Sequence, residues 1–169
     1  IVYRGILYAG LMVNDENSNP HGPVAKSGSS VNVVEFNARF GDPETEAVLP
    51  RLGGDFAKAL LHAATGRLKD EDIVVKDECA ATVIVSSGGY PGSYEKDKEI
   101  SGLAEAGEDA IVFHCGTKAD DGKVLTSGGR VLSVTGIGAT LREAVDKAYA
   151  AIGKISFEKM FYRKDIAHR

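Results

Sequence analysis

The sequence predicts an α+β protein in which short strands are covered by helices. Residues 6–13 form a compact apolar run, typical of a buried strand, and residues 31–40 alternate between apolar and polar side chains. Later in the chain, apolar runs separated by turn signals predict four more strands, at residues 80–86, 110–116, 123–126 and 130–136. A final helix after these strands would cover the sheet that they form.

Capping signals mark two helices in the first half of the chain. The first should begin at Pro43, with Asp42 as its cap, and should continue to a break at Gly53. Asp55 can cap the second helix, and Gly66 is a suitable stop for it.

The final helix and the connections have signals of their own. Thr140 followed by Glu143 forms a capping box at the start of a segment with one apolar face. Residues 14–30 are rich in Asn, Ser, Gly and Pro, which predicts a loop. Asp121–Gly122 is a hairpin turn signal.

Composition excludes several classes of function. The 169 residues are 43% hydrophobic and 26% charged, with a net charge of −4, which is typical of an ordinary soluble protein and unsuited to nucleic-acid binding. No apolar stretch approaches the ~20 residues that span a bilayer. Cys79 and Cys115 lack metal-ligand spacing, and we expect both to be buried thiols in a reducing cytoplasm.

The most informative segment is residues 33–46. Strand alternation places Glu35, Asn37 and Arg39 on one face, just before Gly41 and the start of the first helix. Glutamate and asparagine oxygens suit Mg²⁺ or Mn²⁺, and an arginine can hold a phosphate or carboxylate. From alternation alone, these side chains could equally be exposed positions on a half-buried strand, or Arg39 could pair with a nearby acid.

Four ordered motifs extend over nearly the whole chain. They are residues 3–12, residues 35–45 (EFNARFGDPET), residues 88–92 (GGYPG), and residues 114–118 with 128–132. Together with the ending at residues 163–166, they resemble the phosphoribosylamine–glycine ligase (glycinamide ribonucleotide synthetase) family, which consists of ATP-grasp enzymes of de novo purine synthesis.

The resemblance implies a domain organisation. Residues 1–68 would be the C-terminal part of the ATP-grasp catalytic domain, and residues 69–169 a small mixed α/β C-terminal domain, with the charged segment 69–77 at the boundary. The partners of this chain would then be the N-terminal and ATP-binding lobes of the same enzyme. Since the chain contains nothing like the family's glycine-rich loop over the ATP phosphates, we expect it to be inactive alone.

The resemblance also implies an activity and its cofactors. The full enzyme would use ATP and Mg²⁺ or Mn²⁺ to phosphorylate the carboxylate of glycine, and the amine of 5-phosphoribosylamine would attack the resulting glycyl phosphate. The alternatives are another ATP-grasp ligase of purine metabolism, or a non-catalytic binding module that retains the fold.

By resemblance, each motif residue receives a role. Glu35 and Asn37 would be the metal ligands, and many ATP-grasp enzymes have an acid on the neighbouring strand where this chain has Ala9 and Gly10. Arg39 would bind the reacting carboxylate or a phosphoryl oxygen. Asp42 would contact the amine substrate if it does not serve as the helix cap.

The second set of implied residues would bind the ribose phosphate. Lys118 and Arg130 are the expected cations, and the backbone N–H groups of Gly116–Thr117 and Gly128–Gly129 would form a nest for the phosphate. The alternative is that Lys118 and Arg130 are simply solvated. The remaining histidines at positions 21, 62 and 168 are expected to be surface residues without partners, and His114 a satisfied core or rim residue.

Overall fold

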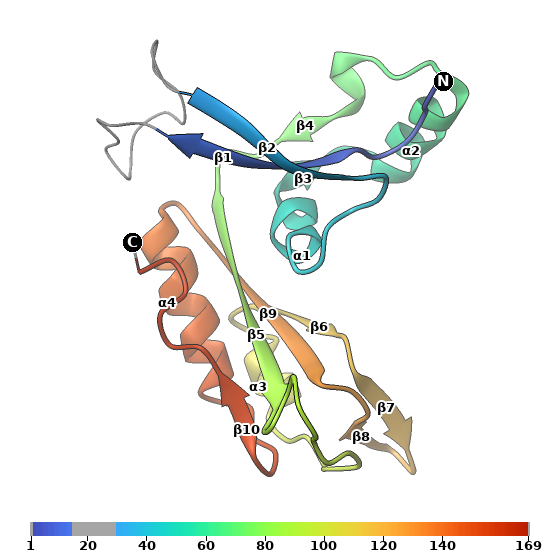
Figure 1. The fold of residues 1–169 in the computed structure, drawn as a ribbon. Coiled ribbons are helices and arrows are strands. Elements are labelled where there is room, and N and C mark those ends of the chain that lie inside the picture. Colours follow the sequence, from blue (N-terminus) through green and yellow to red (C-terminus); the bar gives the residue numbers. More distant parts are fainter. Residues whose placement is uncertain (1, 15–29, 169) are drawn as a thin grey trace. The chain divides into compact units, whose positions relative to one another are not determined.

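The computed structural model describes residues 2–14 and 30–168 (Figure 1). Their contacts form two compact units, one made of residues up to 42 with 55–73, and the other of residues 43–54 with 74–168. The predicted loop at 14–30 lies almost entirely outside the described residues, as does His21. The assignment of residues 1–68 and 69–169 to two domains stays a prediction, because the contacts group residues 43–54 with the later part of the chain.

In the first unit, two antiparallel strands pair as β1 (Tyr8–Asn14) and β2 (Ser30–Asn37). The prediction of a buried first strand is wrong for the described residues, and the second strand is exposed as well. Leu11 on β1 is 53% exposed, and Val33, Val34 and Phe36 on β2 are 54%, 67% and 61% exposed. The reason is that this sheet has two strands, and no second layer from the described residues of the first unit covers them.

The helix of the first unit follows its predicted signals. α2 (Phe56–Thr65) begins where the Asp55 carboxylate accepts a hydrogen bond from the backbone N–H of Lys58 at 2.9 Å, and it ends at Gly66 in a left-handed conformation. A short 3₁₀ turn, η2 (Asp70–Asp72), follows. Both predicted helix ends are therefore confirmed.

The second unit is built on an antiparallel sheet in the order β10–β5–β9–β6, and α4 runs along β5 and β9 (Figure 1). The α+β class is confirmed, and the predicted strands correspond to observed ones, although the edge strand β10 was not predicted. The bounds are β5 (Cys79–Ser87), β6 (Ile111–His114), β9 (Arg130–Gly138), α4 (Leu141–Ile152) and β10 (Met160–Tyr162).

The core of this unit lies between the sheet and α4. Gly136 on β9 allows the helix to approach closely, since a Cβ atom there would lie 2.0 Å from the carbonyl oxygen of Ala144. The largest fully buried side chains are aliphatic residues of β5, β9 and α4, namely Val83, Val85, Val131, Leu132, Val134 and Ile152.

The first turn of α4 confirms the capping box, with one change. The Thr140 hydroxyl accepts a hydrogen bond from the backbone N–H of Glu143 at 3.2 Å. The Glu143 carboxylate accepts from the N–H of Ala139 at 3.0 Å, one residue before the cap. None of the helices in residues 2–14 and 30–168 is long and apolar enough to cross a membrane.

The smaller elements include a hairpin, β7 (Thr117–Asp120) and β8 (Lys123–Thr126). Asp121 and Gly122 connect the two strands with positive φ angles of 45° and 73°, as the predicted turn requires. The strand predicted to continue through residue 116 ends at His114, and β7 was not predicted. Two short strands, β3 (Leu52–Gly53) and β4 (Val74–Val75), also pair, and α3 is Leu103–Ala106.

The predicted helix from Pro43 is wrong at both ends. α1 spans only Thr45–Val48, and its N-cap is Glu44 rather than Asp42. The chain then tightens into the 3₁₀ turn η1 (Leu49–Arg51). Pro50 explains the early end, because it has no N–H to donate to the carbonyl of Glu46 four residues earlier.

The carbonyl oxygen of Glu46 instead accepts a hydrogen bond from the Thr135 hydroxyl on β9 at 3.0 Å. Thr135 is fully buried, and its oxygen also lies 2.7 Å from the hydroxyl oxygen of Thr82 on β5. Since Thr135 uses its one proton for Glu46, Thr82 must donate to Thr135. This chain of hydrogen bonds joins α1 to the two central strands.

We predict that Thr135→Val lowers the free energy of unfolding by about 1–3 kcal/mol, because two partly buried polar groups, the Thr82 hydroxyl and the Glu46 carbonyl, lose their partner. Urea unfolding followed by circular dichroism would measure the change. Ser133→Ala is the matched control, since Ser133 is buried on the same face of β9 and its hydroxyl has no hydrogen-bond partner among the described residues. Equal losses in the two variants would contradict the prediction.

Candidate functional site

Glu35 and Asn37 lie on the same face of β2, as predicted. They pair across the sheet with Gly10 and Tyr8 of β1. A Cβ atom on Gly10 would come within 3.1 Å of the Glu35 Cγ, so the glutamate side chain lies across Gly10. Glu35 is exposed and Asn37 half-buried.

This pair of side chains has the donor chemistry of a Mg²⁺ or Mn²⁺ site. Neither makes a side-chain hydrogen bond that the structure records within residues 2–14 and 30–168, so a carboxylate and an amide oxygen are presented on one face. The described residues contain no cluster of three or more His, Cys, Asp or Glu side chains that could hold a metal. The residues present therefore fit a site with two protein oxygen ligands, the others coming from substrate or water.

The next two predicted residues follow the end of β2 on the same segment. The Arg39 guanidinium donates to the carbonyl of Phe40 at 2.8 Å and is otherwise exposed. Because a guanidinium carries five N–H donors, four remain for other groups. Asp42 is exposed and lies two residues before Glu44, which occupies the N-cap position that the sequence predicts for Asp42.

In the second unit, the glycines of two motifs are explained by backbone packing. A Cβ atom on Gly116 would lie 2.4 Å from the carbonyl oxygen of Arg130 and 2.7 Å from the Cα of Gly128. The ring of Tyr90, from the GGYPG turn, covers Gly129 in the same way. Three motifs distant in the sequence therefore meet at this glycine junction, formed by residues 88–90, 116 and 128–130.

Two backbone N–H groups of the expected phosphate nest, those of Gly116 and Gly128, already have partners within the fold. The N–H of Gly116 donates to Val131 at 3.0 Å, and that of Gly128 donates to the carbonyl of Gly116 at 3.1 Å. Both are therefore used within the fold, and the prediction is wrong for these two glycines.

The predicted phosphate-binding side chains lie around the junction. Thr117 and Lys118 follow Gly116 at the start of β7, and Arg130 begins β9 opposite Ser86. The Thr117 hydroxyl lies 2.9 Å from Nδ1 of His114, which is exposed and so belongs to the rim. The junction thus brings the two cation-bearing strands together at the level of the backbone.

Lys118 has a partner that the sequence analysis missed. Its ammonium lies 2.8 Å from a carboxylate oxygen of Asp97. This hydrogen bond raises the pKa of Lys118 and lowers that of Asp97. No motif in the sequence includes Asp97. The only signal that could have found it is an acidic residue in the segment between two predicted strands.

Two further expectations are corrected by the structure. His62 is not without a partner, because its Nδ1 lies 2.8 Å from Asp72, and this hydrogen bond lowers the pKa of Asp72. The cysteines are free, as expected, but Cys115 is exposed and Cys79 only half-buried.

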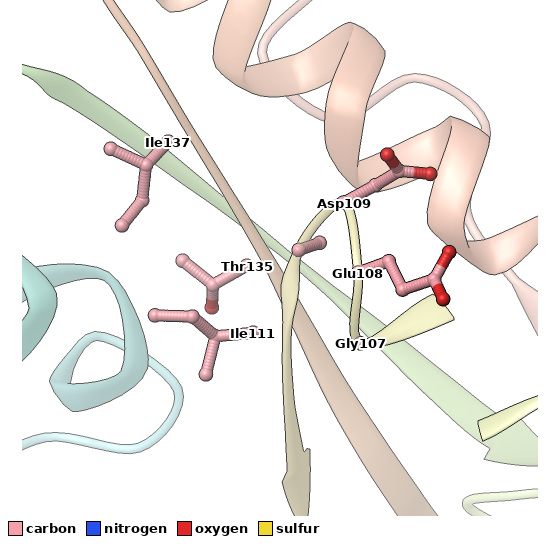
Figure 2. Close-up of a pocket in the computed structure, with 7 residues that line it drawn as sticks. Gly107, Glu108, Asp109, Ile111, Thr135 and Ile137 are labelled. Carbon is pink, nitrogen blue, oxygen red and sulfur yellow. The ribbon is translucent and has the colours of Figure 1, made fainter. Parts of the chain in front are cut away.

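Two hollows of the second unit are lined by residues other than the predicted site residues. One, of about 230 Å³, is lined by residues 107–111 with Thr135 and Ile137. Figure 2 shows the side chains of Ile111, Thr135 and Ile137 on one side of β6 and the carboxylates of Glu108 and Asp109 on the other. A larger hollow, of about 510 Å³, follows the polar face of α4. The residues lining the first hollow include no cation, so it does not suit a phosphate.

An ion-pair network holds the segment that carries Asp97. The Lys98 ammonium lies 2.7 Å from carboxylate oxygens of both Glu95 and Glu158. Glu95 also pairs with Lys159, just before β10. Hydrogen bonds from Lys159 and Lys98 lower the pKa of Glu95 to about 2.

Comparison with known proteins finds relatives that match nearly the whole chain. The sequence profile described as "Phosphoribosylglycinamide synthetase, C domain" matches residues 80–169. The chain is 49% identical over 167 residues to the phosphoribosylamine–glycine ligase of Caldanaerobacter subterraneus, covering 99% of this chain and 37% of that protein. The corresponding ligase of a Synechocystis species is 47% identical over 171 residues, covering 100% of this chain and 38% of that protein.

A solved structure agrees with this result. The crystal structure of phosphoribosylamine–glycine ligase from Thermotoga maritima matches with a TM-score of 0.75 and 37% sequence identity, over 95% of this chain and 36% of that one. The chain thus spans well under half the length of these relatives.

We predict that Glu95→Gln flattens the acid limb of the stability curve. Because the folded pKa of Glu95 is depressed, its contribution to stability is complete above pH ~4.5 and is lost as the pH falls through about 2. Urea unfolding at a series of pH values should show a shallower decline for Glu95→Gln, and for Lys98→Met combined with Lys159→Met, than for the unaltered chain. Parallel curves would show that the network does not stabilise the fold.

Proposed function

The chain belongs to the phosphoribosylglycinamide synthetase C-domain family, and from this we propose that it is the C-terminal part of an ATP-dependent ligase that joins glycine to 5-phosphoribosylamine. The observation that carries the proposal is the 49% identity to a phosphoribosylamine–glycine ligase over 99% of the chain. This match includes both compact units. It favours this ligase over another ATP-grasp enzyme or a non-catalytic module.

The proposed metal ligands are Glu35 and Asn37. Bound Mg²⁺ or Mn²⁺ would neutralise charge on the ATP phosphates as the phosphoryl group is transferred to glycine. Glu35 supplies a charged oxygen and Asn37 a neutral one, so the pair would bind a divalent ion without neutralising it fully. The metal would then keep positive charge for the nucleotide.

Arg39 and Asp42 are proposed to act on the reacting groups. Arg39 has unused N–H donors beyond its bond to Phe40, and two of them can hold a carboxylate or a phosphoryl oxygen side by side. The exposed carboxylate of Asp42 can accept a hydrogen bond from the amine of 5-phosphoribosylamine. Both residues orient reactants, and neither serves as a nucleophile, as suits a reaction that proceeds through positioning.

Lys118, Arg130 and the Thr117 hydroxyl are proposed to bind the 5-phosphate of the ribose. Arg130 can bind phosphate in a bidentate manner, while Lys118 contributes a point charge. The phosphate would be held by side chains rather than by a backbone nest, since the N–H groups of Gly116 and Gly128 already have partners. We further propose a cytoplasmic enzyme, which suits the two free thiols.

We predict that Glu35→Gln in the full-length protein weakens Mn²⁺ binding by at least about tenfold, the effect of losing even an outer partner of a metal ligand. Titration of Mn²⁺ measures binding, and phosphate release in the presence of ATP, glycine and 5-phosphoribosylamine measures activity. Glu71→Gln, an exposed acid of the first unit, is the matched control.

The same assay tests the function itself. The full-length protein should require all three substrates, and the 169-residue chain alone should be inactive. A full-length protein without this activity would refute the proposed function, whereas normal Mn²⁺ binding by Glu35→Gln would refute the ligand assignment alone.

Replacement of Lys118 or Arg130 by Met should raise the KM for 5-phosphoribosylamine by about tenfold to a hundredfold and leave the KM for ATP nearly unchanged. Such a change corresponds to the loss of one charge-assisted hydrogen bond, about 1.5–3 kcal/mol. Lys123→Met, on the other strand of the same hairpin, should change neither value. A selective rise in the KM for ATP would instead assign the pair to the nucleotide.

A further inference from the structure

The positive charge of Lys118 is already paired with a carboxylate when no phosphate is bound. Its ammonium and the Asp97 carboxylate form an ion pair at 2.8 Å, and both side chains are about half exposed. Any anion that binds Lys118 must therefore approach this carboxylate as well.

Asp97 is held firmly in its position. Its φ angle is 62°, a left-handed conformation that Asp and Asn tolerate better than most residues. Its backbone N–H donates to the carbonyl of Thr126 at 2.7 Å, and the next N–H donates to the Thr126 hydroxyl at 3.1 Å. Thr126 is fully buried, and Lys98 is fixed by two ion pairs. The backbone that carries the carboxylate is thus anchored on both sides by hydrogen bonds and ion pairs.

A phosphate bound to Lys118 would lie close to Asp97. Two hydrogen bonds of ~2.8 Å through one ammonium place the two anions within about 6 Å of each other. This separation is shorter than the screening length of ~8 Å in physiological salt, so the repulsion is not removed by ions.

We propose that Asp97 is a built-in counterion that competes with the substrate phosphate for Lys118 and thereby lowers phosphate affinity. The inference rests on the proposed phosphate site.

The test is calorimetric titration of the full-length protein with inorganic phosphate and with ribose 5-phosphate at low salt and pH ~8. Asp97→Asn keeps the left-handed backbone and a hydrogen-bond acceptor while removing the charge. It should bind both probes about two- to fivefold more tightly, the range expected for an exposed ion pair. Glu99→Gln is the matched control, since Glu99 pairs with Lys123 at 2.7 Å on the same segment, and it should leave binding unchanged.

Three results would overturn the inference. Unchanged or weaker binding by Asp97→Asn, while Lys118→Met still abolishes binding, refutes the competition and leaves the phosphate site standing. Equal tightening in Asp97→Asn and Glu99→Gln reduces the effect to net charge. A lack of saturable binding in the unaltered full-length protein, or full binding by Lys118→Met, refutes the phosphate site and the inference with it.

Discussion

The close contact between α4 and β9 governs the architecture of the second unit. Gly136 lets the helix backbone approach the strand, and this fixes the depth at which the aliphatic residues of β5 and β9 meet α4. β9 also pairs with β6, and the segment before it lies against Gly116. The position of Arg130 at the start of β9 therefore follows from packing in the core, at the other end of the same strand.

Local sequence signals correctly predicted the helices that begin at their own capping residues. α2 and α4 begin at Asp55 and Thr140 because a side chain caps each helix from within four residues. α1 was misjudged because its length depends on Pro50 and on a hydrogen bond from Thr135, 89 positions away. Distant contacts of this kind leave no periodic trace in the sequence.

In the candidate site, too, features set by local sequence were predicted and contacts between distant elements were not. Strand alternation placed Glu35 and Asn37 on one face, since side-chain direction is a local property. The pairs Lys118–Asp97 and His62–Asp72 were missed, because they join residues from different elements. Gly116 and Gly128 were interpreted as ligand-binding glycines, yet they are small because two backbones touch. A glycine in a sequence does not reveal which of these reasons applies, and the chemical roles of the site residues remain predictions.

The grouping of residues 43–54 with 74–168 has a consequence for modularity. Exchange of the C-terminal half between related proteins at residue 68 would separate β4 from β3 and the Thr135 hydroxyl from Glu46. A hybrid joined there would assemble its second unit from two parental sequences that had not evolved together. Hybrids whose junction keeps the segment beginning at Pro43 together with the sheet from the same parent should fold more successfully.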